Sequence, residues 1–377
     1  MEEMVPFLDL HRQYAELKTE IDSAVERVFS SSRFILGPEV ERFEEEFAAY
    51  CGVRHAIGVN SGTSALHLAL VAAGIGHGDE VITTSFTFYA SVAAIEYARA
   101  TPVLVDIDPR TFNIDTRALA AAETPRTRAI LPVHLYGQPA NMDAIMEVAK
   151  KHRLIVIEDA AQAHGARWRG QRVGSFGEFG CFSFYPTKNL GAPGEAGMIT
   201  TNDDELAHSA RLLRDWGNDR RYHPILKGYN YRLPGLQAAV LRARLPRLEA
   251  WNQMRREVTS TYQRLLASTG LRLPEVLPEA ESVWHLYTVR TPDRDRLQQL
   301  LRDDGIETAV HYPQPVHLMP AYREERWPSG SFPEAEACAE TVLSLPLFPG
   351  LSTEQAAFVA ERAAAAMDAC RAAPQLS

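Results

Sequence analysis

Lys188 stands in a segment that is unusual for an ordinary surface lysine. It lies in "SFYPTKNLGAPGEAG" (183–197), where two prolines and several glycines make the chain rigid and tightly turned. A lysine held there beside aromatic residues has its ammonium form disfavoured, and the neutral amine can attack a carbonyl carbon to form a Schiff base. The segment therefore predicts a nucleophilic lysine, provided that other loops bring matching groups to it.

Two carboxylates, Glu158 and Asp159, lie where the apolar run "RLIVIED" ends. One of them should project into the crevice beyond the end of this predicted strand. A buried carboxylate is costly unless it meets a cation or a hydrogen-bond donor, so a partner is expected. Gln162 follows three residues later, and His164 is a candidate for the partner or for a neighbour behind it.

Two further loops could hold a phosphate and a flat ring. In "NSGTSALHLAL" a predicted strand ends at Val59, and we expect a helix to begin near Thr63 or Ser64. The backbone N–H groups of Gly62, Thr63 and Ser64 would then be free to bind a phosphate dianion, with a simple capped helix as the alternative. In "SFTFYAS", Phe88 or an aromatic neighbour could stack on a ring, with core packing as the alternative.

These residues need a framework, and a series of short apolar runs indicates which one. The runs are "HAIGV", "EVITTSF", "TPVLVDI", "RAILPVHLY", "RLIVIED", "GCFSF" and "AGMITT". Several are apolar throughout, as in strands that are buried on both faces of a sheet with helices packed on each side. An α/β fold is predicted, in which ligands bind at the carboxyl ends of the strands.

The pattern changes after a long helical stretch that is broken at Pro246. Fewer strands follow, then the proline-rich "HYPQPVHLMPAY" and an alanine-rich terminal helix. We predict a large domain over residues 1–246 and a smaller C-terminal α+β domain over residues 247–377.

Composition narrows the classes of partner. The chain has 377 residues with 46% hydrophobic and 23% charged residues, and its formal net charge of −9 disfavours nucleic acid and anionic membranes. No apolar run reaches membrane-spanning length and the first residues do not resemble a signal peptide, so a cytoplasmic protein without a membrane partner is expected. The four scattered cysteines predict neither disulfides nor a metal site.

A phosphate cradle, an aromatic plate, a carboxylate and a lysine together describe a site for pyridoxal 5′-phosphate (PLP). This cofactor withdraws electrons effectively while its ring nitrogen is protonated, which a facing carboxylate ensures, and a lysine can hold its aldehyde. Each element is weak evidence alone, but the combination is specific.

The sequence also resembles the sugar aminotransferases of the DegT/DnrJ/EryC1/StrS family. The resemblance extends from "FLDL" nearly to the C-terminus, through "NSGTSALHLAL", "IEDAAQAHGA", "SFYPTKNLGAPGEAGMITT", "YNYRLPGLQAA" and "SLPLFPGL". It implies an aspartate-aminotransferase-like fold (fold type I), with a large, mostly parallel-sheet domain and the smaller α+β domain. It further implies these cofactor contacts: Lys188 in the Schiff base, Asp159 on the ring nitrogen, Gln162 and Phe88 at the ring, and Thr63, Ser64 and Ser183 around the phosphate.

The resemblance also bears on assembly and reaction type. In this family an asparagine that corresponds to Asn230 reaches the phosphate from the neighbouring subunit, which implies a homodimer with shared active sites. From the residues alone, Asn230 is equally well explained as a turn residue. Certain relatives carry histidine in place of the lysine and are dehydratases, so the presence of Lys188 favours amino transfer.

The implied substrates are L-glutamate and a nucleotide-linked keto-sugar. Candidate substrate contacts are Tyr185, Arg232, His311, Tyr312 and His317. The block "TAVHYPQPVHLMPAY" resembles that of relatives that aminate carbon 3 (C3), whereas "NSGTSAL" departs from the "NG-x-DAL" form of many C3 enzymes. Amination of C3 in a dTDP- or UDP-linked hexose is favoured, with C4, a cyclitol ketone, or a non-catalytic PLP-binding regulator as alternatives.

Overall fold

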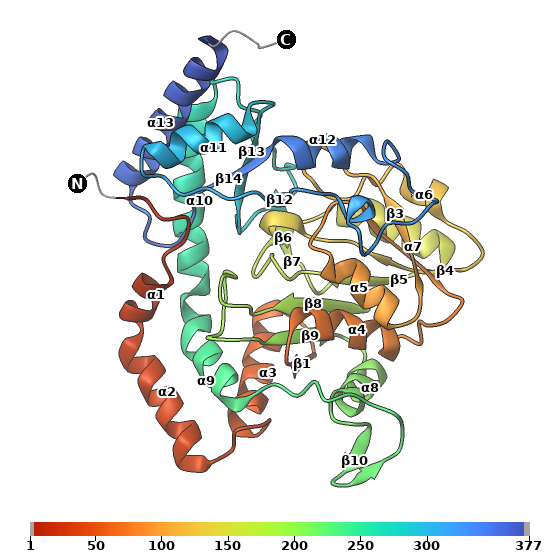
Figure 1. Cartoon of the computed structure of the whole chain (residues 1–377). Coiled ribbons are helices and arrows are strands. Elements are labelled where there is room, and N and C mark those ends of the chain that lie inside the picture. Colours follow the sequence, from red (N-terminus) through yellow and green to blue (C-terminus); the bar gives the residue numbers. More distant parts are fainter. Residues whose placement is uncertain (1–3, 373–377) are drawn as a thin grey trace.

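The computed structural model describes residues 4–372 and has a seven-stranded sheet at its centre, in the order β1-β9-β8-β5-β4-β2-β3 (Figure 1). The strands are β1 (His55–Val59), β2 (Glu80–Thr84), β3 (Thr101–Val105), β4 (Thr127–Leu131), β5 (Ile155–Asp159), β8 (Phe179–Ser183) and β9 (Gly197–Thr201). Only β9 in this sheet runs antiparallel to its neighbours. Every predicted apolar run forms one of these strands, and the mostly parallel α/β sheet is confirmed.

Helices cover this sheet. They are α3 (Pro38–Cys51), α4 (Gly62–Ala72), α5 (Ala90–Tyr97), α6 (Leu119–Ala122), α7 (Met142–His152), α8 (Asp204–Arg214) and α9 (Gly235–Arg244). Helix α3 begins at a proline and ends where Gly52 adopts a φ of +75°, which a glycine tolerates without strain. A proline in the first turn and a glycine after the last turn are residues that favour the start and the end of a helix.

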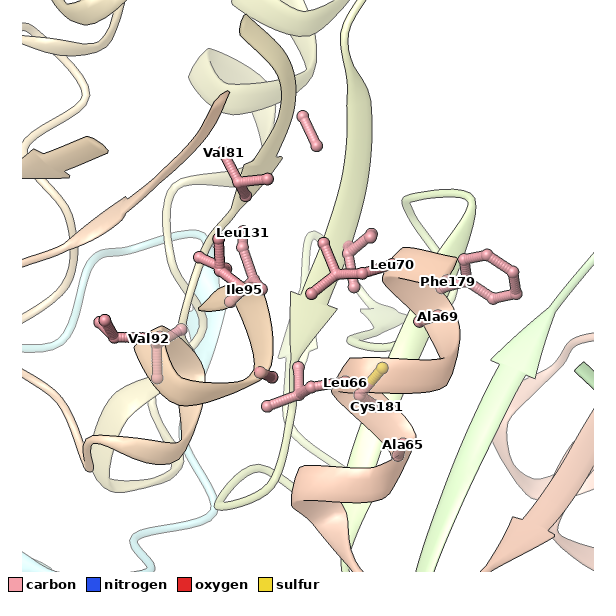
Figure 2. Close-up of a cluster of buried hydrophobic side chains, with 14 of the residues drawn as sticks. Ala65, Leu66, Ala69, Leu70, Val81, Val92, Ile95, Leu131, Phe179 and Cys181 are labelled. Atoms are coloured by element: carbon pink, nitrogen blue, oxygen red, sulfur yellow. The ribbon is translucent and has the colours of Figure 1, made fainter. Parts of the chain in front are cut away.

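Helix α4 carries apolar residues on most of its surface because it is enclosed by other elements. In Figure 2, Leu66 and Leu70 of this helix lie among side chains of the sheet and of helix α5, with Phe179 and Cys181 of β8 close by. Burial of such side chains contributes about 1.5–3 kcal/mol each, so the start of α4 is held firmly against the sheet.

The C-terminal part forms a second packed unit (Figure 1). A short 3-10 turn, Leu245–Arg247, separates α9 from α10, as Pro246 predicts. The remaining elements here are α10 (Leu248–Leu266), β13 (Tyr287–Arg290), α11 (Arg294–Asp303), α12 (Pro333–Thr341), β14 (Val342–Leu345) and α13 (Thr353–Ala372). A separate cluster of buried side chains from α10, α11, β13, β14 and α13 favours the predicted division near residue 246, which stays a prediction.

The N-terminal segment crosses onto this C-terminal unit before the first helices begin. Val5 donates its N–H to Gly305 and accepts a hydrogen bond from Glu307 N, at 2.9 and 3.0 Å. Phe7 donates its N–H to the Glu307 carboxylate and stacks on the His311 ring, with 5.8 Å between centroids. Helices α1 (Leu10–Glu16) and α2 (Lys18–Ser31) follow, and α2 packs along α9.

The short strands complete the described elements. They are β6 (Arg167–Trp168), β7 (Gln171–Arg172) and β12 (Ala280–Glu281) in one small sheet, and β10 (Asn218–Arg220) with β11 (His223–Pro224) in a hairpin. Two further 3-10 turns are Leu135–Gly137 and Val316–Leu318. None of the helices within residues 4–372 combines the length and apolar character that a membrane span requires.

Candidate active site

A cavity of about 570 Å³ lies beyond the carboxyl ends of β1, β2, β5 and β8. Ten of the predicted site residues line it: Gly62, Thr63, Phe88, Asp159, Gln162, Ser183, Tyr185, Lys188, His311 and Tyr312. Because these strands point the same way, the four loops singled out in the sequence meet at one edge of the sheet.

The two carboxylates at the end of β5 point to different surroundings, as alternation along a strand requires. Asp159 lines the cavity, whereas Glu158 is fully buried away from it. The Glu158 carboxylate lies 3.0 Å from His134 Nε2 and accepts the N–H groups of Gly174, Phe176 and Gly177 at 2.7–3.0 Å. Glu158 therefore holds the loop that leads into β8.

Asp159 is bound by neutral donors only. Its Oδ2 accepts the hydroxyl of Ser91 at 2.7 Å, and its Oδ1 accepts the N–H of Ala161 at 3.1 Å. Ser91 lies on α5, 3.1 Å from the hydroxyl of Thr87, and both are buried. Burial raises the pKa of Asp159, while the Ser91 hydrogen bond and the Lys188 charge oppose that rise. The carboxylate forms no ion pair with residues 4–372, so it can still receive a cationic partner.

Lys188 follows a turn in which its N–H bonds to Tyr185 O at 2.9 Å. The side chain is part-buried at the cavity, and its Nζ has no hydrogen bond or ion pair within the described residues. Burial lowers the pKa of Lys188 to about 8, although the Asp159 charge opposes that change. About half of the amines are thus neutral and nucleophilic at pH 8.

The phosphate cradle differs from expectation in one respect. Helix α4 begins at Gly62, not at Thr63 or Ser64, because Ser61 is its N-cap. The Ser61 hydroxyl oxygen accepts Ser64 N–H at 3.0 Å and donates to Ser64 Oγ at 2.9 Å, so Ser64 N–H is not free. Ser64 is buried behind the cavity, which leaves Gly62, Thr63 and Ser183 to contact an anion.

Gly62 also fits a tightly closed cradle. A Cβ atom at this position would lie 2.6 Å from Ser183 Cβ, which is closer than side chains pack. The absence of a side chain therefore lets the helix N-terminus approach the end of β8. Backbone N–H groups at such a terminus are suited to a phosphate.

Aromatic and amide groups line the remaining wall. Phe88 faces the cavity and is 43% exposed, whereas Phe86 is fully buried in the core, which decides between the two rings. Gln162 accepts Tyr136 N–H at 2.8 Å and donates to Tyr312 OH at 3.0 Å. Burial raises the pKa of Tyr312, so its phenol stays protonated with its own hydrogen free to donate.

Besides Ser64, three predicted residues do not line this cavity. His317 is fully buried, where its Nε2 lies 3.0 Å from a Glu336 oxygen, so the structure does not support a substrate contact. Asn230 is exposed, and its side-chain oxygen accepts a hydrogen bond from Arg232 at 2.6 Å. Arg232 also pairs with Asp215 at 3.1 Å. Neither Asn230 nor Arg232 reaches the cavity of its own chain.

Sequence reasoning missed several polar residues at the site, among them Ser91 and His285, and one of its two alternatives for His164 is not found in the structure. Ser91 was within "SFTFYAS", and its spacing of four residues from Thr87 matches one face of a helical turn, a signal that could have been used. His285 lines the cavity, but it is far away in the sequence and carried no local signal. His164 does not pair with Asp159: it packs against Phe182 and Phe184, where burial lowers its pKa to about 3.

A mostly parallel sheet that sets a lysine and a carboxylate at its carboxyl edge, beside a helix N-terminus, defines the fold type I class of PLP-dependent transferases. Within that class, the chain belongs to the DegT/DnrJ/EryC1/StrS aminotransferase family, whose model matches residues 15–363. The predictions of the fold and of the family are therefore confirmed. Solved relatives of this fold include forms described as PLP-bound and PMP-bound.

The chain is similar to several named proteins. It is 52% identical to a dTDP-3-amino-3,4,6-trideoxy-alpha-D-glucose transaminase of Streptomyces venezuelae, over 93% of each chain. It is 50% identical to a Geobacillus stearothermophilus "pleiotropic regulatory protein", over 96% of this chain and 98% of the other. Its structure matches that of S. venezuelae DesV in complex with a ketimine intermediate, with a TM-score of 0.95, 51% identity, and coverage of 97% and 99%.

Other relatives also carry names of sugar-nucleotide enzymes. Two are named for amination at C3 of UDP- or dTDP-linked sugars, and another is named GDP-perosamine synthase. All are at least 46% identical to this chain.

Proposed function

We propose that this protein is a PLP-dependent aminotransferase that moves an amino group from L-glutamate to C3 of a nucleotide-linked keto-sugar. The observation that carries this proposal is that Lys188, a lysine of lowered pKa, and Asp159, a buried carboxylate without an ion pair in the described residues, line the same cavity. The names of the C3-aminating relatives support the choice of substrate class and position.

The residues present fit the cofactor. Asp159 offers an anionic group without a cationic partner, and the close approach of Gly62 to Ser183 leaves a cradle for a dianion. When bound, PLP supplies an electrophilic carbonyl and a ring that accepts electrons. Gly62, Thr63 and Ser183 would hold its phosphate, and Phe88 and Gln162 would orient its ring.

Two side chains would carry out the proton chemistry. The Asp159 carboxylate, whose ionised form is favoured by the hydrogen bonds from Ser91 and Ala161, would hold a proton on the ring nitrogen. Lys188 Nζ, with a pKa of about 8, can both accept and donate a proton near neutral pH, as a group that moves protons between two carbon centres must.

Two alternatives stand beside this proposal. C4 amination stays an alternative from the sequence, and a regulatory role is favoured by two relatives with regulatory or sensory names. The site argues against a purely regulatory role, because a protein without turnover has little use for Lys188, Asp159 and Gln162 together. Amination of a cyclitol ketone stays an alternative without a supporting relative among those described above.

The active site would be completed by a second copy of the chain. Asn230 is exposed and close to the β10–β11 hairpin, around which Trp216, Tyr222 and Ile225 expose apolar surface. Exposed apolar side chains of this kind favour a protein interface. We therefore retain the homodimer, with Asn230 reaching the partner's phosphate site and Arg232 nearby as a substrate contact. A cytoplasmic location stays a prediction from the sequence.

Coexpression of Lys188→Ala and Asn230→Ala chains tests the shared site. Neither variant should turn over efficiently alone, but each mixed dimer would contain one site with both residues intact. Statistical mixing should then restore about a quarter of wild-type activity. If Asn230 acts within its own chain, mixing restores nothing.

Spectroscopy of the holoenzyme tests the proposed reaction. Addition of L-glutamate should convert the visible band of bound PLP to that of the pyridoxamine form, and a dTDP-linked 3-keto-sugar should reverse it. NMR of the product would locate the new C–N bond at C3. A wild-type spectrum that is unchanged by glutamate, or a bond at C4, contradicts the corresponding part of the proposal. Lys188→Ala should abolish turnover.

A further inference from the structure

His285 lines the cavity but has no part in the proton chemistry described above. It precedes β13 and is 7% exposed. Its backbone is fixed from two sides: its carbonyl oxygen accepts from Arg255 Nη1 at 3.3 Å, and a Cβ on Gly137 would lie 2.7 Å from its backbone nitrogen. The imidazole is therefore held at one place in the wall.

The hydrogen bonds of Asn189 determine which nitrogen of His285 carries the proton. Asn189 Nδ2 donates to Asn252 Oδ1 and to Val283 O, both at 2.9 Å. A carbonyl oxygen can only accept, so both amide hydrogens of Asn189 are used and its Oδ1 is an acceptor. His285 Nδ1 lies 3.2 Å from that oxygen and must therefore donate to it.

The other ring nitrogen of His285 is then an acceptor. Burial, together with the charges of Lys188 and Arg255, lowers the pKa of His285 well below 6.5, with smaller contributions from His311 and His164. The ring is neutral at physiological pH, so Nε2 bears a lone pair. It has no hydrogen bond within residues 4–372, and the residue faces the cavity.

The geometry points to His285 Nε2 as a specificity-determining acceptor that binds a hydroxyl on a carbon next to the carbonyl of the acceptor sugar. This inference rests on the proposed function. A neutral lone pair attracts a hydroxyl and disfavours a carboxylate or phosphate. Tyr312, whose phenol hydrogen is free, lines the same cavity, so one donor and one acceptor are available to a hydroxy-ketone.

The names of two relatives provide a matched pair of probes. A dTDP-3-amino-3,6-dideoxygalactose retains hydroxyls at C2 and C4, whereas dTDP-3-amino-3,4,6-trideoxyglucose is the same sugar without the C4 hydroxyl. A 2-deoxy analogue of the first completes the set. Their dissociation constants for the apoprotein, measured by calorimetry, report binding without turnover. The rate at which each converts the PLP form of the enzyme reports on the same contact.

In the wild type, loss of one hydroxyl should weaken binding by roughly 10- to 100-fold, because the acceptor is left unpaired. His285→Phe should lose this discrimination, and His285→Gln, which retains an acceptor oxygen, should keep part of it. The half-reaction with L-glutamate should change by less than about threefold in both variants. His208→Phe, at an exposed position on α8, is the matched control.

Several outcomes overturn the inference. One is a His285→Phe variant that discriminates among the three sugars as the wild type does. Another is a His285→Phe variant whose glutamate half-reaction slows by the same factor as its sugar binding weakens, because His285 would then act on Lys188 and not on the sugar. Nitrogen-15 NMR of the apoprotein gives an independent check, because protonation at Nε2 contradicts the assigned tautomer. If glutamate converts the holoenzyme but none of the sugars binds, only the sugar contact fails. If glutamate does not convert it either, the proposed function fails as well.

Discussion

Replacement of Ser91 by alanine tests whether a hydroxyl on α5 keeps Asp159 ionised. The 2.7 Å bond from Ser91 is made to a charged oxygen in a buried site, where such bonds contribute about 1.5–3 kcal/mol. At 1.36 kcal/mol per pKa unit, its loss should raise the pKa of Asp159 by about 1–2 units. The direction follows because burial already favours the neutral acid and the hydrogen bond opposes it.

The assay is the pH dependence of kcat/KM for the glutamate half-reaction. Its acid limb should move up by about 1–2 pH units in Ser91→Ala. The pKa that this limb reports is an apparent value, which belongs to Asp159 and the cofactor nitrogen together. Ser91→Thr, which retains a hydroxyl, should restore most of the wild-type profile.

Unfolding of the apoprotein gives a second measure. A carboxylate whose folded pKa is raised makes the folded state less stable as pH rises through that pKa. The difference in stability between Ser91→Ala and the wild type should therefore be larger at neutral pH than below pH 4. Thr200→Val removes a buried hydroxyl that bonds to Gly174 O at 2.6 Å, and it should lower stability without moving the acid limb. An unmoved acid limb in Ser91→Ala refutes the reasoning.

Three other perturbations probe the same edge of the sheet. The rate at which the apoprotein captures PLP should rise with pH around a midpoint near 8, because the neutral Lys188 amine is the reactive form; a midpoint near 10 would contradict its lowered pKa. Gly62→Ala places a Cβ 2.6 Å from Ser183 Cβ and should weaken PLP binding by roughly 5- to 100-fold in equilibrium dialysis, whereas unchanged binding would mean that the cradle adjusts freely. Glu158→Gln places an amide N–H group against backbone and histidine groups that already donate. It should lower the free energy of unfolding by about 2–4 kcal/mol in urea titrations. The control is Glu257→Gln, which replaces a carboxylate bonded to the exposed Gln253 and should lower it by no more than about 0.5 kcal/mol.

The sheet was predictable because its strands are buried on both faces and their sequences are therefore continuous apolar runs. Each run, from "HAIGV" to "AGMITT", became one strand. The reversed direction of β9 could not be read in the same way, since a buried strand has the same composition in either orientation. Strand β14 was not identified as a strand, because "VLSL" is too short to be distinguished from a buried loop.

The site divides along similar lines. Asp159 was found because it is a carboxylate at the end of an apolar run, and Lys188 because it stands in a rigid segment rich in proline and glycine; both line the cavity. Ser64 was assigned a free N–H because the capping role of Ser61 was not recognised. His285 escaped notice because its role depends on contacts with Asn189 across 96 positions of sequence. Side chains that act through distant partners leave no periodic signal nearby.

The path of the first residues has a practical bearing on how the protein should be produced. Val5 is hydrogen-bonded to both Gly305 and Glu307, and Phe7 stacks on the ring of His311, which lines the cavity. A fusion partner joined to the N-terminus would therefore be tethered close to the contact between Phe7 and His311 at the cavity wall, and it could alter selectivity without any change of sequence inside the pocket. Purification through a tag placed after α13 avoids this interference.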